Sequence, residues 1–389
     1  MCTLFLVGCW DRKELREIGP IVAIGLDKDL NTGKILFTAQ VIRVGALSKE
    51  GGTQESPIEI VSSSGNTLFE AIRNSTEKLD RKNLYFHTKV IVIGEALAKE
   101  GVMPILDTFT RGKEMRGYVW LAVTQEGVQA REILGVKSKI ERIQAAYLKH
   151  VIENKEFHAG ANTSDLLTYY IKSLESGIEP TIGVLKVIEE RNFPVENKLG
   201  KTTKQVKFSG VAAFKDDKLI GFLNKKETQG LNWIIGEVKS KAIILPSLIK
   251  KDKLISIEVI RTTSHIEPKI KGNNISFSIN VTQEGSLVEQ QSMNNIIEPK
   301  EIVDYLKKVE RKNEELIKKE IEMAVNKAQK ELRSDIFGFG DALNKKYPQK
   351  WDKIQDRWDK LFPKIDYEVN VNVKIIRTDF KKGTFQPKD

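Results

Sequence analysis

The chain has 389 residues, of which 40% are hydrophobic and 30% charged, and its formal net charge is +10. This share of apolar side chains excludes an intrinsically disordered chain, and the length indicates more than one domain. The basic excess is scattered as lysine pairs such as Lys225–Lys226 and Lys345–Lys346, without a patch of arginine and aromatic residues, so we expect no nucleic-acid partner.

The two cysteines of the chain, Cys2 and Cys9, both lie within the first nine residues. Their position excludes structural disulfides and cysteine-ligated zinc in the rest of the chain. The segment Leu6-Val7-Gly8-Cys9 is typical of a bacterial lipobox, in which small residues fit the peptidase and the cysteine sulfur accepts a diacylglycerol. We therefore predict lipidation at Cys9 and assign residues 1–8 to the remnant of a lipoprotein signal peptide.

A secretory signal should carry a basic segment followed by an apolar core of about 7–15 residues. Only eight residues precede Cys9, and none of them is basic. We therefore predict that the true start lies upstream and that this sequence begins at an internal Met. Two acyl chains anchor a protein durably, so the expected product is a body tethered outside a membrane. The alternative is a buried N-terminal strand with an incidental cysteine.

The N-terminal region alternates apolar strands with helical segments. We expect strands at 18–26 and 35–44, a loop at 45–64, a helix capped by Ser64 and ending near Leu79, a strand at 88–94, a helix at 95–110 and a strand at 117–124. This succession predicts a sheet covered by helices. The pattern then becomes helical over residues 130–174 and returns to a strand at 179–190.

The second half of the chain has strands in which apolar and polar residues alternate. This pattern covers 206–215 with the hairpin partner 218–223, then 275–281 and 367–375, and it is typical of antiparallel sheets with one buried face. A long helix is predicted from Pro299 to Leu332, stopped by Phe337-Gly338-Phe339-Gly340. A shorter helix is expected over 349–362, ended by Pro363.

The predicted fold is α+β, mixed and multi-domain. It has an N-terminal β-α region with a helical segment and a C-terminal, mostly antiparallel sheet packed with a long helix. We assign residues 9–195 to the N-terminal region, with a subdomain split near 130. The polar stretch 196–205 is assigned to a linker and residues 206–380 to the C-terminal domain.

The search for chemistry yields no catalytic motif. None of the histidines, His87, His150, His158 and His265, has a metal-site spacing, and neither a nucleophile elbow nor a phosphate-binding loop is present. His87 is interpreted as a residue that hydrogen-bonds a turn, and a ligand pair of His150 with His158 is disfavoured. We therefore expect no enzyme activity, no cofactor and no metal.

Trp351 and Trp358 lie seven residues apart and share a helical stripe with Ile354 and Leu361. Such a stripe usually belongs to a hydrophobic core. The alternative is a contact with a partner or a membrane interface, because tryptophan is favoured at both.

Three segments resemble one known family. "GCWDRKELREIGPIVAIGLDKD" at Gly8–Asp29 resembles the start of the mature C-subunit lipoproteins of bacterial spore germinant receptors, the Ger(x)C family. "LYFHTKVIVIGEALAKEG" at Leu84–Gly101 is similar to the family's strand and following helix. "GVAAFKDDKLIGFLNKKETQGLNWIIG" at Gly210–Gly236 is similar to its C-terminal hairpin.

The resemblance implies a non-enzymatic, lipid-anchored receptor subunit that helps to trigger spore germination. It implies localisation on the outer face of the spore inner membrane, with Cys9 as the lipidated residue. The implied partners are a membrane-embedded, permease-like A subunit and a B subunit.

Two other classes of function stay open at this point. A lipid-anchored extracellular solute-binding protein of a transporter would usually have two similar α/β lobes around a cleft, which the second half of this chain does not suggest. An envelope hydrolase would need a catalytic constellation, and the sequence contains no recognisable one.

Overall fold

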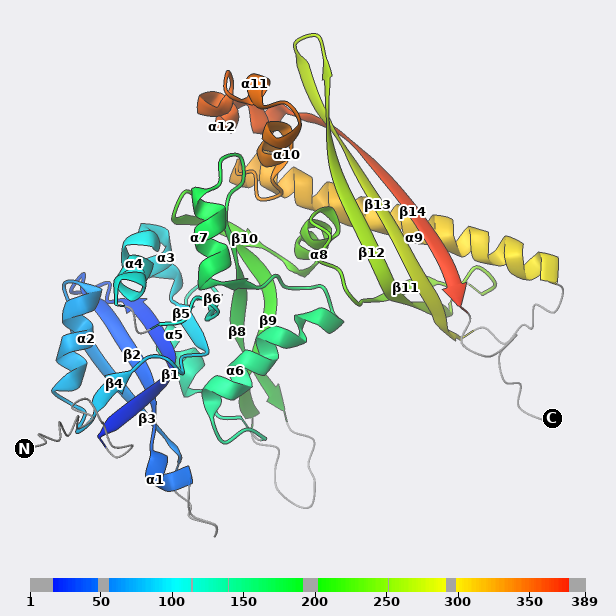
Figure 1. Ribbon diagram of the computed structural model, residues 1–389. Helices are drawn as coiled ribbons and strands as arrows, with labels where there is room; N and C mark the ends of the chain where they lie inside the picture. Colours follow the sequence, from blue (N-terminus) through cyan, green and yellow to red (C-terminus); the bar gives the residue numbers. More distant parts are fainter. Residues whose placement is uncertain are drawn as a thin grey trace, which may run out of the picture.

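The computed structural model describes residues 17–47, 56–112, 115–138, 140–191, 202–250, 252–291 and 299–377. Two β-sheets organise these residues, each with its own helices (Figure 1). The first sheet is built from the N-terminal part of the chain, and the second sheet lies beside the long helix α9 (Pro299–Asn326). The mixed, multi-domain α+β fold predicted from the sequence is confirmed.

The first sheet has ten strands, eight of them in the order β10-β9-β8-β6-β5-β1-β2-β3. The strands are β1 (Ile18–Lys28), β2 (Ile35–Ile42), β3 (Ile58–Gly65), β4 (Lys82–Leu84), β5 (Val90–Ile93), β6 (Trp120–Thr124), β7 (Ser164–Asp165), β8 (Thr181–Arg191), β9 (Thr202–Lys215) and β10 (Lys218–Leu223). Neighbours among β1, β5, β6 and β8 are parallel, whereas β2, β3, β9 and β10 add antiparallel pairs at the two sides. Helices cover both faces of the parallel centre, which is why β5 reads as an unbroken apolar run.

The helices of this region divide between the two faces of the sheet. They are α1 (Val44–Leu47), α2 (Leu68–Thr76), α3 (Glu95–Glu100), α4 (Met103–Arg111), α5 (Ala130–Gly135), α6 (Gln144–Glu153) and α7 (Leu166–Leu174). Apolar residues of α2, α3, α4 and α7 form one core with the sheet, and those of α5 and α6 form a second core on its other face.

Three details of the N-terminal prediction were wrong. Residues 58–64 of the expected loop belong to β3, which pairs with β2 along its whole length. Thr67, not Ser64, caps α2, and its side chain accepts a hydrogen bond from the Glu70 backbone N–H at 3.1 Å. The helix expected over 95–110 is divided into α3 and α4 at Gly101, whose φ of 131° suits glycine rather than a helix interior.

The expected linker at 196–205 overlaps the first sheet. Residues 202–205 belong to β9, which pairs with β8 from Arg191–Thr202 to Thr181–Ala213. The hairpin β9–β10 therefore extends the first sheet, although its alternating pattern was assigned to the C-terminal domain. Residues 192–201 lie outside the described residues.

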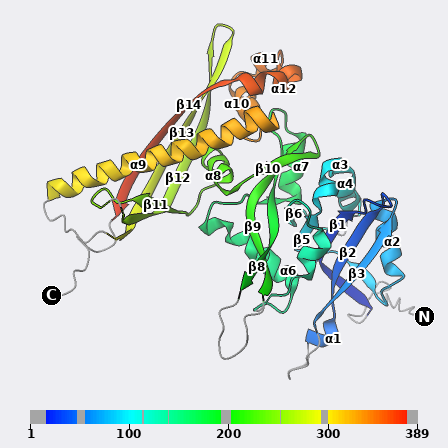
Figure 2. The ribbon, with the colours of Figure 1, turned by 180° about the vertical axis from the view of Figure 1, so that it is seen from behind.

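The second sheet has the order β11-β12-β13-β14 and is antiparallel except for the parallel pair β13–β14. Its strands are β11 (Ala242–Pro246), β12 (Leu254–Lys271), β13 (Asn274–Gln290) and β14 (Asp366–Arg377). The helices of this region are α8 (Lys225–Ile234), α9, α10 (Phe339–Lys346), α11 (Pro348–Trp351) and α12 (Trp358–Leu361). Helix α9 lies along the sheet (Figure 2) and buries Val309, Ile317 and Ile321 against it. The long helix that the sequence predicted from Pro299 onward is therefore confirmed.

The long helix ends at the predicted residue, Leu332, but the segment predicted to stop it and the helix predicted after it differ from the structure. The last turn of the long helix is π-helical over Lys327–Leu332, and its C-cap residue Arg333 has a left-handed conformation. Gly338 is the N-cap residue of α10, so the Phe-Gly-Phe-Gly segment begins a helix instead of stopping one. The helix expected over 349–362 is a series of short helical turns.

The two sheets meet at a junction formed by residues 177–179, 214–217 and 334–341. The Asp341 N–H donates to the carbonyl of Gly177 at 3.0 Å, and the Glu179 N–H donates to the carbonyl of Asp335 at 2.8 Å. A Cβ atom at Gly177 would lie only 2.5 Å from the carbonyl carbon of Gly340, so this close backbone approach requires glycine.

Candidate functional site

The predicted lipidation residue Cys9 lies outside the described residues, which begin at Glu17. The chain enters the fold where Ile18 of β1 pairs with Lys82 of β4. A cavity of about 320 Å³ opens beside this point, between α2, β4 and α4, and is lined by Phe69, Ile72 and Phe109 among others. None of the helices in the described ranges is long and apolar enough to cross a membrane.

The histidines are placed separately. His87 lies exposed in the turn closed by the Thr88 N–H and the Tyr85 carbonyl. His150 on α6 has Glu141 and Glu153 within 3.8 Å, at the surface. His158 follows α6, and its Nδ1 accepts a hydrogen bond from the Gly160 N–H at 3.0 Å. Burial, with Lys225 and Lys207 nearby, lowers the pKa of His158. In the part of the chain that the structure describes, no cluster of three or more histidine, aspartate or glutamate residues could hold a metal ion.

The tryptophan stripe belongs to the core of the second sheet. Trp351 and Trp358 are 2% and 5% exposed, and their ring centroids lie 5.2 Å apart in an edge-to-face arrangement. The ring centroids of Trp358 and Phe277 lie 6.2 Å apart. The core interpretation is therefore confirmed, and the interface alternative is wrong for these two side chains.

A buried carboxylate that sequence reasoning missed organises the segment after α9. Asp335 accepts backbone hydrogen bonds from residues 337, 338, 339 and 340 at 2.8–3.3 Å and one from the Trp358 indole N–H at 3.0 Å. Burial raises the pKa of Asp335 to about 6, against the lowering effect of these donors. The sequence feature that could have indicated this role is an aspartate shortly before a glycine-containing helix start.

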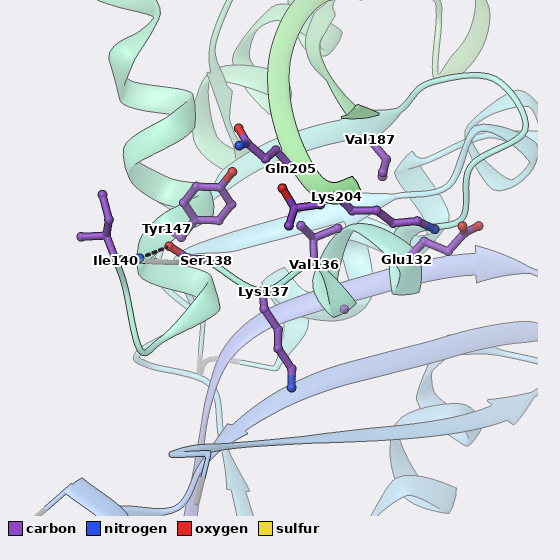
Figure 3. Close-up of a pocket in the computed structure, with 11 residues that line it drawn as sticks. Glu132, Val136, Lys137, Ser138, Ile140, Tyr147, Val187, Lys204 and Gln205 are labelled. Carbon is purple, nitrogen blue, oxygen red and sulfur yellow. Dashed lines mark hydrogen bonds between the residues drawn. The ribbon is translucent and has the colours of Figure 1, made fainter. Parts of the chain in front are cut away.

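A cavity of about 740 Å³ lies between the loop that joins α5 to α6 and the strands β8 and β9. Figure 3 shows its lining, with Tyr147 from α6, Glu132 from α5, and Lys204 and Gln205 from β9. The Tyr147 hydroxyl is engaged with the backbone N–H and carbonyl of Val206, both at 3.2 Å. The Tyr147 hydroxyl is therefore already bound to the backbone of β9, and the lining carries charges of both signs.

A further cavity of about 810 Å³ lies beside the junction of the two sheets. It is lined by side chains from both sheet regions, including Lys172 of α7, His265 of β12 and Lys346 of α10. Lys345 and Lys346 are paired with Asp341 and Glu267 at 2.6 and 2.9 Å. Most of the charge around this cavity is thus neutralised within the protein.

Glu179 titrates near neutral pH at the same junction. Burial, together with the carboxylates of Asp216 and Asp359, raises the pKa of Glu179 to about 7, although the Asp216 N–H donates to it at 2.8 Å. The folded protein therefore holds a proton that the unfolded chain releases near pH 4.5. This contribution to stability is complete below about pH 4.5 and is lost as the pH rises through about 7.

A Glu179→Gln variant should remove this part of the pH dependence. The amide keeps an acceptor for the Asp216 N–H and carries no charge. We expect the variant to be more stable than the parent by about 1–2 kcal/mol at pH 8 and equally stable at pH 4. Urea unfolding across this pH range measures the difference, with the exposed Glu301→Gln as control. Parallel pH profiles of parent and Glu179→Gln would contradict the prediction.

Two families of spore germination domains match the chain in order. The family described as "Spore germination protein N-terminal domain" matches residues 11–187, and "Spore germination B3/GerAC like, C-terminal" matches residues 209–379. The crystal structure of the GerBC protein is similar in fold, with a TM-score of 0.54 at 20% identity, covering 91% of this chain and 96% of that one.

Curated relatives extend over nearly the whole chain. Spore germination protein KC of Bacillus subtilis (strain 168) is 27% identical, and the alignment covers 98% of this chain and 95% of that protein. Spore germination protein YndF of the same organism is 28% identical over 96% of this chain and 94% of its own length. Spore germination protein B3 is 26% identical, with coverages of 96% and 94%. The chain therefore belongs to the Ger(x)C family of spore germination proteins.

Proposed function

We propose that the chain is the lipid-anchored, non-enzymatic C subunit of a nutrient germinant receptor that triggers spore germination. The observation that carries this proposal is the match of both germination domains, in order, over residues 11–187 and 209–379. The relatives that align over almost its full length are themselves named spore germination proteins.

Two features of the fold support a binding and assembly role. His150 and His158, residue types suited to acid–base chemistry, are engaged separately with surface glutamates and a backbone N–H. The two sheets are dissimilar, with ten strands around a parallel centre in one and four mostly antiparallel strands in the other. A transporter's solute-binding protein would instead have two similar lobes.

The proposal includes the anchor and the partners. Residues 1–8 belong to a signal peptide, Cys9 carries the lipid, and the body lies on the outer face of the spore inner membrane. There it assembles with a membrane-embedded, permease-like A subunit and a B subunit. The net charge of +10 supports a position beside an anionic membrane surface.

Replacing Cys9 tests the anchor, and Cys2 offers a matched control. When the protein is expressed from its own chromosomal gene, the parent and Cys2→Ala should partition into detergent with the membrane lipoproteins. Cys9→Ala should move almost entirely to the aqueous phase, because each buried acyl CH₂ contributes about 0.8 kcal/mol to membrane binding. Mass spectrometry of the N-terminal peptide should find a diacylglycerol adduct in the parent and in Cys2→Ala, but not in Cys9→Ala.

The same strains test the receptor role. Spores with Cys9→Ala or without the gene should lose the response to at least one nutrient, followed as the fall in optical density on germination, whereas Cys2→Ala spores should respond normally. An unchanged response to every nutrient, in a strain without the other receptors of this type, would refute the receptor role. Equal detergent partitioning of the two alanine variants would refute only the anchor.

A further inference from the structure

The cavity of about 810 Å³ beside the junction of the two sheets has the size of a small-ligand site. Its lining comes from α7 and the loop after it, from the end of α8, from β12 and from α10 with the residues before it. Figure 1 shows these elements around the place where the two sheet regions meet. Each lining residue lies within an uninterrupted described range, so the walls of the cavity are complete.

Lys172 of α7 brings an unpaired positive charge to this cavity. Its Nζ has no hydrogen-bond or ion-pair partner within the ranges that the structure describes. The side chain is half-buried, and its Nζ is not one of the solvent-inaccessible atoms that lack a partner, so a ligand can reach it. Burial lowers the pKa of the Lys172 ammonium group, although the carboxylates of Glu237 and Glu175 oppose this shift. The charge is thus partly removed from water without a counter-ion in contact with it.

The two carboxylates that face Lys172 are already paired with other lysines. Glu237, which also lines the cavity, accepts from Lys155 Nζ at 2.9 Å, and Glu175 lies 3.7 Å from Lys345 Nζ. The other two lysines of the lining have carboxylates within 2.9 Å. Among the described residues that line this cavity, Lys172 is therefore the lysine whose ammonium group remains available to an anion from outside the protein.

A large part of the lining is apolar. Ile234 and Phe337 are 1% and 3% exposed, and Ile178, Ile235 and Ile266 line the same cavity while only partly buried. An aliphatic group that enters the cavity could cover these three isoleucine side chains. A ligand that fits therefore combines one anionic group with an aliphatic part.

We propose that this cavity binds an aliphatic carboxylate, whose oxygens accept from Lys172 Nζ and whose hydrocarbon part lies against Ile178, Ile235 and Ile266. A hydrogen bond between two charged groups is stronger than one between neutral groups, so the carboxylate supplies most of the selectivity. A free small acid and the C-terminal carboxylate of a polypeptide that ends in an aliphatic residue share this chemistry. The inference does not depend on the receptor role, because it rests only on the cavity and its unpaired lysine.

Calorimetric titration of the full chain with isocaproate tests the site, with isocaproamide as the neutral ligand of the same shape. The carboxylate should bind at least about tenfold more tightly than the amide. Lys172→Met should reduce the affinity for isocaproate to that for the amide, and Lys172→Arg, which keeps the charge, should retain most of it. Lys204→Met removes an exposed lysine from the cavity of Figure 3 and should leave the affinity unchanged.

Each variant is first checked by thermal unfolding, and Lys172→Gln replaces Lys172→Met if that variant fails to fold. The tripeptide acetyl-Ala-Ala-Leu distinguishes the two sources. Tighter binding of the peptide than of isocaproate would identify a polypeptide C-terminus, and equal or weaker binding a free small acid. Equal affinities for isocaproate and its amide, equal binding by Lys172→Met and the parent, an equal loss in Lys204→Met, or no binding at about 10 mM would overturn the proposal.

Discussion

An Asp335→Ala variant should lose about 4 kcal/mol or more of unfolding free energy at pH 7.5, measured by guanidinium unfolding and tryptophan fluorescence. One carboxylate accepts four backbone N–H groups, from residues 337–340, and the indole N–H of Trp358. Its removal would leave these donors buried and unpaired in the segment that begins α10. The same segment meets the first sheet, since the Asp335 carbonyl accepts from the Glu179 N–H.

Two further variants separate this role from a general effect of substitution. Asp335→Asn keeps one acceptor oxygen but turns an NH₂ group toward other donors, so an intermediate loss of about 2 kcal/mol is expected. Asp341→Asn removes a partly exposed ion pair with Lys345 and should cost less than about 1 kcal/mol. A loss below 1 kcal/mol for Asp335→Ala would show that water replaces the carboxylate at little cost.

A Glu320→Leu variant should be destabilised by about 3–5 kcal/mol, because it leaves a buried ammonium group without its partner. The Glu320 side chain on α9 is 8% exposed and lies 2.6 Å from Lys241 Nζ, whose own side chain is 6% exposed. Glu320 also accepts from the Trp233 indole N–H of α8 at 2.7 Å. Burial lowers the pKa of Lys241, and Glu320 opposes that shift. The pair therefore ties α8, α9 and the start of β11 together.

The double variant Lys241→Met with Glu320→Leu gives the decisive comparison. Two apolar side chains of similar size remove both charges, so most of the stability lost in Glu320→Leu should return. The exposed pair Lys239–Glu156 is the control, with side chains 61% and 51% exposed, and Glu156→Ala should cost less than about 1 kcal/mol. A double variant as unstable as Glu320→Leu would mean that the Trp233 hydrogen bond, not the charge, dominates.

The regular elements could be predicted because their patterns are local. The apolar run of β5 and the alternation in β9, β13 and β14 each reflect which faces of a strand are buried. The apolar stripe of α9 predicted a long helix in the same way. The family resemblance of three segments was likewise carried by contiguous residues, and the domain matches confirm it.

The assignment of strands to sheets could not be read locally. An alternating strand such as β9 satisfies its own pattern in either sheet, and only the pairing of its backbone with β8 decides where it belongs. The signal that stops the long helix could not be read locally either, because it is the left-handed backbone at Arg333, which that residue type does not favour, and not the Phe-Gly-Phe-Gly segment.

The sequence by itself determined the fold class, the long helix, the buried tryptophan stripe and the family, because each depends on local residue order. Only the tertiary structure decided which polar side chains act together. Asp335 meets Trp358, Lys241 meets Glu320, and Lys172 lines one cavity with Glu237 and His265 although they are far apart in the chain. Such pairings arise from packing between elements, and no periodicity within a single element records them.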